Sequence, residues 1–334
     1  MSREKENGDG KVVLVLGGGP AGVLTAARLA DLGHHVTLVN KVRAGEGLEL
    51  TPTEVRELLR SHGLEASADS FGPVVETEVV WQGKKTGGQQ HVVHRRLLDQ
   101  ALLYDVARRH VNIVGGIAGG ITRVGENWRV GVGEFEYEAD FLIEARGREA
   151  GNAGGQDSVS CLSMRYRMPT DYRPFAAVTS FREGWARFIL GERREASLQV
   201  YLSGENTDIP VRPFPLKKKF QSIVDELSGT WAFLADAQAR GEVEQRSAFS
   251  RLREPLIGME SIRIGDAAMA LEPLPGFGME QGLENALLAL PVIESWLQGG
   301  NKQQLAAQYK DQVAAAFEAL IRSKNTLFPS SENK

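Results

Sequence analysis

The chain has 334 residues and a formal net charge of −4; 42% of its residues are hydrophobic and 25% are charged. This composition is typical of a globular protein with one large or two ordinary domains. Because the net charge is slightly negative, the protein as a whole does not attract polyphosphate, and we expect no nucleic-acid partner. The single cysteine, Cys161, excludes an intrachain disulfide and a cysteine metal cluster, and we predict no metal site.

The start of the chain is charged, and no later apolar run approaches the ~20 residues that a membrane span requires. We therefore predict no membrane span. We expect a cytoplasmic protein whose first residues are frayed.

The first strong pattern is a β-α-β unit. The apolar run from Val12 to Leu16 predicts a strand, residues 21–32 predict a helix, and residues 36–39 predict a second, parallel strand. The turn between strand and helix has the spacing of a dinucleotide fingerprint, in which glycines allow a diphosphate to approach the positive end of the helix. We expect cofactor contacts from Gly17, Gly19, Pro20, Ala21 and Gly22. At the ribose we place Asn40 and Lys41, although the fingerprint ordinarily has an acidic residue there and the Asn40 amide carries no charge.

The following elements are predicted in chain order. A helix begins at Thr51-Pro52 and ends near Ser61, because Pro52 suits the first helical position and Glu54 stands in capping-box register. A hairpin spans residues 74–93, and an amphipathic helix covers 96–109 before a strand at 111–114. Short strands follow up to residue 143. Residues 158–250 are predicted as strands first and then two helices, over 219–227 and 230–240.

A second glycine-rich turn stands far downstream. The run Ile262-Arg263-Ile264-Gly265-Asp266 leads into Pro273-Leu274-Pro275-Gly276-Phe277-Gly278, and a helix over 278–297 follows, with a last helix over 302–323. One cofactor held at two distant points of the chain explains both turns.

Taken together, the two turns resemble the FAD-dependent monooxygenases of the para-hydroxybenzoate hydroxylase fold, including their halogenase-like branch. The resemblance implies FAD as the cofactor. It implies that Gly265 and Asp266 hold the ribityl chain and that Arg95 reaches the phosphates, where a guanidinium suits a diphosphate. It also implies that the helix from Met279 points its N-terminus at the flavin. The candidates that would face the flavin are Pro275, Gly276, Phe277, Gly278 and Glu280; no catalytic residue is assigned beyond them.

Two departures from the family matter. The hydroxylases have an Asp-Gly pair where this chain has Arg146-Gly147, so the electron donor stays open between NAD(P)H and a separate reductase. Flavin halogenases need a lysine shortly after a Glu-x-Leu segment, which Glu46-Gly47-Leu48 resembles, and no lysine lies between Lys41 and Lys84. Their Trp-x-Trp motif is also incomplete, because Arg187 stands in place of the second tryptophan.

The function that the resemblance implies is hydroxylation of an aromatic substrate through a flavin C4a-hydroperoxide. The substrate is either an aromatic small molecule or a protein side chain. The Ala145-Arg146-Gly147-Arg148 sequence and the compact length are similar to the flavoproteins that modify tryptophan of a partner enzyme in tryptophylquinone maturation, as for glycine and lysine oxidases. The alternatives are an FAD-dependent reductase or dehydrogenase of an apolar small molecule, a flavin halogenase, and a non-catalytic flavin-carrying maturation partner.

The fold class expected is α/β: a discontinuous Rossmann-like FAD-binding domain with an inserted mixed-sheet substrate domain and C-terminal helices. We predict the FAD-binding domain in three parts, 1–70, 93–155 and 256–300. The substrate domain is predicted to comprise a hairpin at 71–92 and residues 156–255. Residues 301–334 are predicted as a C-terminal helix.

Overall fold

A six-stranded sheet is assembled from three separate parts of the sequence. The computed structural model describes residues 10–42, 47–150, 159–203, 213–274 and 276–328. The strand order is β17-β18-β10-β1-β2-β6, and all neighbours pair in parallel except β17 at one edge. The strands are β1 (Val12–Leu16), β2 (His35–Asn40), β6 (Asn112–Gly115), β10 (Phe141–Glu144), β17 (Ile257–Gly258) and β18 (Ser261–Arg263). Strand β1 lies in the middle of the sheet, which explains why it is apolar on both faces.

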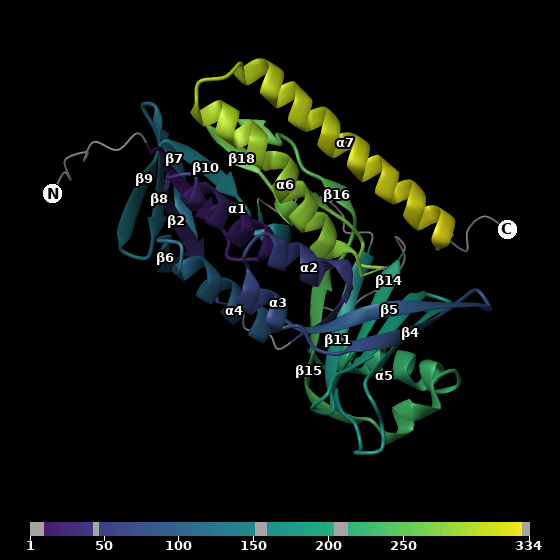
Figure 1. Cartoon of the computed structure of the whole chain (residues 1–334). Coiled ribbons are helices and arrows are strands. Elements are labelled where there is room, and N and C mark those ends of the chain that lie inside the picture. The colour runs from purple at the N-terminus through teal and green to yellow at the C-terminus, as the bar shows by residue number, and fades with distance from the viewer. Residues whose placement is uncertain (1–9, 43–46, 151–158, 204–212, 275, 329–334) are drawn as a thin grey trace.

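Helices cover one face of this sheet and a small sheet covers the other. The helices α1 (Pro20–Asp31), α4 (Arg95–Ala107) and α6 (Gly278–Leu297) share the main hydrophobic core with it. The short helix α3 (Glu65–Asp69) packs beside α4, and α2 (Glu54–Ser61) packs beside α3. Helix α7 (Lys302–Leu327) runs along the outer side of α6 (Figure 1). The opposite face carries β7 (Ala118–Val124), β8 (Asn127–Val132) and β9 (Phe135–Ala139).

An eight-stranded mixed sheet forms the second part of the molecule, at the lower right of Figure 1. Its order is β15-β11-β14-β13-β12-β4-β5-β3, and α5 (Pro213–Ser228) packs on it. The strands are β3 (Leu48–Pro52), β4 (Val74–Trp81), β5 (Lys84–His94), β11 (Val159–Arg167), β12 (Phe175–Phe181), β13 (Gly184–Leu190), β14 (Glu195–Ser203) and β15 (Gln238–Ser247). A small pair, β16 (Arg251–Leu252) and β19 (Met269–Ala270), follows. The predicted fold class is confirmed, whereas the numerical domain limits stay predictions; β3 joins the large sheet although it lies within the first predicted part of the FAD-binding domain.

Two predicted elements are wrong. Residues 230–240 form no α-helix but a 3₁₀ turn, Ala232–Asp236, followed by the long strand β15. Backbone pairing with β11 overrides the helix-favouring composition here, and the exposed edge strand has no apolar alternation that would reveal it. Pro52 does not begin α2 but ends β3, and the capping residue Thr53 makes no side-chain capping bond.

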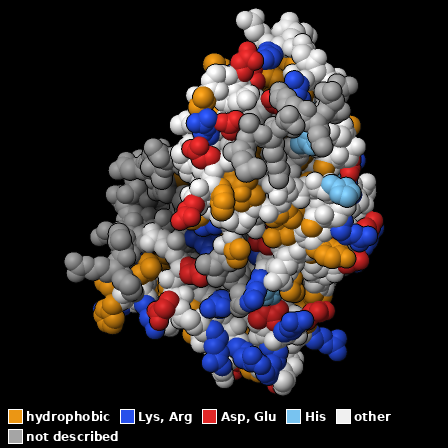
Figure 2. Space-filling model, turned by 90° about the vertical axis from the view of Figure 1, so that its left-hand side faces the viewer, with side chains coloured by type: hydrophobic (Ala, Val, Ile, Leu, Met, Phe, Trp, Pro, Cys, Tyr) orange, Lys and Arg blue, Asp and Glu red, His pale blue; other side chains and the backbone are white. Residues whose placement is uncertain are grey.

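The surface charge is unevenly distributed. Figure 2 shows Lys and Arg side chains gathered at the lower end of one face, which is the end that carries the large sheet in Figure 1. Exposed basic residues on the elements of the large sheet and α5 include Arg165, Arg167, Lys217 and Lys218. The negative net charge therefore does not describe this end of the molecule. In the described part of the chain, no helix is long and apolar enough to cross a membrane.

Candidate functional site

Most of the predicted cofactor residues lie at one edge of the six-stranded sheet. Gly17 follows β1, Asn40 ends β2, and Gly265 comes two residues after β18. These three strands run parallel, so their carboxyl ends share this edge. In open α/β sheets, ligands bind in the crevice outside the carboxyl ends of the strands. The fold thus brings the two glycine-rich turns to the place where a ligand is expected.

The turn after β1 requires glycine for two separate reasons. Gly17 has φ of +116°, and a Cβ there would collide with the backbone carbonyl of Ala145. A Cβ on Gly22 would collide with the carbonyl oxygen of Gly17. Gly19 precedes α1 in an extended conformation, Pro20 occupies its first turn, and neither a side-chain cap nor an acidic residue is present there. The positive end of α1 is therefore left available to an external anion.

The two distant turns contact each other. A Cβ built on Gly265, whose φ is +58°, would lie 2.9 Å from the Cβ of Ala21 and 3.9 Å from the Cα of Gly282 in α6. The Gly265 N–H donates to the Asn285 side-chain oxygen at 2.6 Å. The Tyr309 hydroxyl donates to the Arg263 carbonyl at 2.7 Å and lies 3.3 Å from the same Asn285 oxygen, so α7 supports this junction.

We expect Asn285→Ala to destabilise the protein by about 1–2 kcal/mol, because it leaves the buried Gly265 N–H without an acceptor. Asn285 is only 1% exposed, so water cannot replace its side chain without rearrangement. Urea unfolding of the variant measures the effect. A change within experimental error would mean that the Gly265 turn does not depend on this bond.

The other predicted cofactor residues lie around these turns, and their roles stay predictions. The Asn40 side chain lies against Gly18, and Lys41 forms an ion pair with Glu149 at 2.9 Å. Asp266 has the Arg148 guanidinium 3.7 Å away.

Arg95 begins α4 and is 7% exposed. It pairs with Asp99 at 2.8 Å and with Glu49 at 3.3 Å, while its Nε is buried without a hydrogen-bond partner. These carboxylates offset its charge, and they raise its pKa even though burial, the largest influence, lowers it. The unpartnered Nε leaves one donor available.

The unexpected arginine of the sequence, Arg146, is neutralised locally. Its Nε donates to Glu144 Oε1 at 2.9 Å, and this bond is the main reason why the pKa of Arg146 is raised. The reversal of charge relative to the hydroxylase pattern therefore does not produce a free positive charge at the edge of the sheet.

The part of the second glycine-rich turn that contains Gly276 lies between α6 and the large sheet. Gly276 is buried with φ of +81°, and a Cβ there would lie 2.8 Å from the Gln90 side chain and 3.2 Å from the Leu50 carbonyl oxygen. Phe277 precedes α6 without a capping side chain, and Met279 is buried in its first turn. Pro275 lies outside the described residues.

A buried polar network on the large sheet holds this turn. Arg187, in the middle of β13 and 4% exposed, donates to the Gln199 side-chain oxygen at 2.6 Å and to the Pro273 carbonyl at 3.2 Å. The ring of Trp185 stacks on Tyr201 with centroids 3.8 Å apart, and its Nε1–H donates to Glu272 at 2.8 Å. No site role was predicted for these residues from the sequence. The one sequence feature that indicates them is a charged residue, Arg187, inside an otherwise apolar strand.

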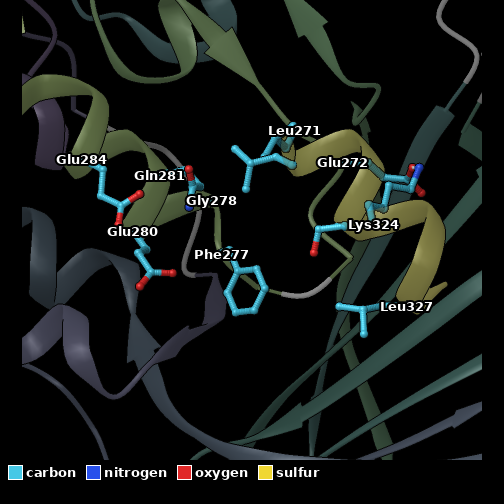
Figure 3. Close-up of a pocket in the computed structure, with 11 residues that line it drawn as sticks. Leu271, Glu272, Phe277, Gly278, Glu280, Gln281, Glu284, Lys324 and Leu327 are labelled. Atoms are coloured by element: carbon cyan, nitrogen blue, oxygen red, sulfur yellow. The ribbon is translucent and has the colours of Figure 1, made fainter. Parts of the chain in front are cut away.

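A cavity of about 260 Å³ opens beside the turn. Figure 3 shows Glu280 and Glu284 approaching it from α6, Lys324 and Leu327 approaching from α7, and the Phe277 ring between the two sides. The remaining lining residues are Leu271, Glu272, Gly278, Gln281, Leu320 and Ser323. Three of the predicted flavin-facing residues, Phe277, Gly278 and Glu280, therefore contribute to one cavity.

The carboxyl group of Glu280 has a raised pKa. Burial is the largest cause, and the negative charges of Glu284 and Glu54 add to it. Because the pKa of Glu280 in the folded protein lies above its ordinary value, the ionised side chain costs stability at neutral pH. It costs none once both the folded and the unfolded state are protonated.

We therefore expect Glu280→Gln to raise the melting temperature of the protein at about pH 7 and to leave it unchanged well below pH 4.5. Thermal unfolding followed across this range measures the difference. Equal melting temperatures at neutral pH, or a lower one for the variant, would contradict the assignment of the carboxylate to a desolvated position.

No model of a known protein family matches the chain. The menaquinone reductase of Mycobacterium tuberculosis is 26% identical to it over 86% of this chain and 77% of the reductase. Among solved structures, QhpG, described as a peptidyl tryptophan dihydroxylase essential for tryptophylquinone cofactor biogenesis, matches 97% of this chain and 77% of its own, at 29% identity and a TM-score of 0.84. The flavin-dependent halogenase CmlS matches 92% of this chain and 62% of its own, at 19% identity and a TM-score of 0.79. The fold is thus that of flavin-dependent monooxygenases and halogenases.

Proposed function

We propose that this chain, which has the fold of the halogenase-like flavin-dependent monooxygenases, binds FAD and hydroxylates an aromatic substrate. The observation that carries the proposal is the contact between the Gly17 turn and the Gly265 turn at the carboxyl edge of the parallel sheet. A dinucleotide flavin is long enough to need both turns, and its diphosphate suits the uncapped end of α1.

The residues present fit FAD. We assign the diphosphate to the backbone of residues 17–22, supported by the buried Arg95, whose Nε has no partner. Asn40 and Lys41 would contact the adenosine ribose, and Gly265 and Asp266 the ribityl chain. Residues 276–279 would then lie along the isoalloxazine ring.

When bound, FAD would supply the activation of oxygen and the transfer of one oxygen atom to an aromatic carbon. The protein's part is position and electrostatic field. Arg187 and Glu272 hold the Pro273–Gly278 segment against the large sheet. The first turn of α6 presents its N–H groups without a capping side chain. Phe277 and the leucines of the cavity give it an apolar surface for an aromatic ring.

We further propose that the substrate is a tryptophan side chain, and that it belongs to a partner protein. The likeness to QhpG over nearly the whole of this chain supports this choice. Electrons would come from NAD(P)H or from a separate reductase; the neutralised Arg146 disfavours neither.

The experiment is a reaction of FAD-loaded protein with oxygen, with NADH or a flavin reductase as donor, and with co-purifying partner protein as substrate. The proposal predicts that the intact mass of the partner increases by one or two oxygen atoms, at a tryptophan. A partner that binds stably and gains no mass would instead support the non-catalytic flavin carrier.

A second candidate is an FAD-dependent reductase of an apolar small molecule. The likeness to menaquinone reductase and the leucine-lined cavity favour it. Turnover of a naphthoquinone such as menadione that proceeds at the same rate without oxygen would support this candidate against the monooxygenase. If the protein were a halogenase, the product would carry chlorine or bromine when halide is supplied. The same mass measurement would detect it.

A further inference from the structure

The cavity beside Phe277 has a negatively charged wall. Of its four charged side chains, Lys324 is bound by Glu272, whose other oxygen receives the Trp185 N–H at 2.8 Å. Glu280 and Glu284 have no hydrogen-bond or ion-pair partner among the described residues. They stand one turn apart on α6, where two like charges disfavour each other. The cavity thus carries a carboxylate acceptor that pairs with no cation among the residues that the structure describes.

The rest of the cavity is small and, apart from Gln281 and Ser323, apolar. Leu271, Leu320 and Leu327 form its sides, and the Phe277 ring stands between them (Figure 3). Its volume of about 260 Å³ lies below the usual range for drug-sized ligands and suits a single aromatic group. Phe277 can pack edge to face against such a ring.

We propose that this cavity receives an aromatic ring that carries an N–H donor, such as an indole, and that Glu280 accepts that N–H. The inference rests on the proposed function and adds to it the place where the ring binds and the side chain that recognises its N–H. At Glu280, a ring with a carboxylate would meet the uncompensated charges of Glu280 and Glu284, and a quinone would place an acceptor against an acceptor. At this position, indoles and aromatic amines therefore bind more tightly than aromatic acids and quinones.

The raised pKa of Glu280 agrees with this assignment, because a carboxylate held without cationic partners gains when a donor arrives. The groups facing it are Glu284 from the same helix, Glu54 from α2, and the Glu272–Lys324 pair across the cavity. If Glu280 only stabilised the helix dipole of α6, it would not distinguish one ligand from another.

The test is calorimetric binding to oxidised, FAD-loaded protein without an electron donor, so that no turnover occurs. The probes are N-acetyl-tryptophanamide, its 1-methylindole analogue and indole-3-acetate. A hydrogen bond to a charged acceptor predicts that the first probe binds about tenfold or more tightly than the methylated one. In Glu280→Gln this preference shrinks, and indole-3-acetate binds more tightly than it does to the unmodified protein.

Glu318→Gln is the matched control, because it removes a carboxylate from the exposed side of α7. It should leave all three affinities unchanged. Equal binding of the methylated and unmethylated probes to FAD-loaded protein would overturn the inference and leave the proposed function standing. Protein that takes up no FAD would overturn both.

Discussion

Gly17→Ala is expected to lower the affinity for FAD by about two orders of magnitude, so that the purified variant retains no flavin. The alanine Cβ would collide with the Ala145 carbonyl, at a φ of +116° that L side chains rarely adopt. Relief of that collision moves either the turn or the end of β10, and both lie where we place the diphosphate. Fluorescence titration with FAD measures the affinity of the variant.

The control for this variant is Gly88→Ala in β5, where an added Cβ meets no atom within 4 Å and φ is not in the left-handed range. It should bind FAD as the unmodified protein does. Circular dichroism of both apo-proteins shows whether the Gly17 variant still folds. A folded Gly17 variant with unchanged FAD affinity would show that the diphosphate does not bind at this turn.

Lys324→Met is expected to destabilise the protein by about 3 kcal/mol, because it leaves the Glu272 carboxylate buried without its cation. Glu272 is 7% exposed, and the Trp185 N–H remains as its hydrogen-bond donor. Glu272→Leu is expected to cost less, because the Lys324 side chain is 26% exposed and can turn toward water. Urea unfolding of each variant measures these costs.

The double variant Glu272→Leu/Lys324→Met should cost clearly less than the sum of the two single changes, because an apolar pair leaves no charge unpaired. Arg322→Met, which breaks the exposed pair with Glu318, serves as the control and should change stability by less than about 0.5 kcal/mol. Strictly additive costs at Glu272 and Lys324 would mean that the two side chains do not stabilise each other.

The parts of the fold that the sequence predicted well are those with a strong local signal. The apolar run of β1, the glycine turn and α1 follow from periodicity and turn chemistry, and α6 begins and ends at its predicted residues. The strand β15 could not be predicted, because its side chains are almost all exposed and only its pairing with β11 makes it a strand. Strand β3 was missed for a different reason: it is largely buried, but its Pro52 fits a helix start as well as the end of a strand.

The candidate site divides in the same way. The glycine motifs indicated the turns because Gly17, Gly22, Gly265 and Gly276 each have a steric reason to be glycine. The Arg187 network and Lys324 depend on contacts between strands, turn and C-terminal helix that are far apart in sequence. Nothing near Lys324 in the sequence indicates that it meets Glu272, so only the fold could place it at the cavity.

The most direct test of the central claim is the flavin content of the purified chain after incubation with FAD and gel filtration. We predict a yellow protein that releases one FAD per chain on denaturation. A colourless protein that releases no adenine nucleotide, and takes up none when FAD is offered, would contradict the account.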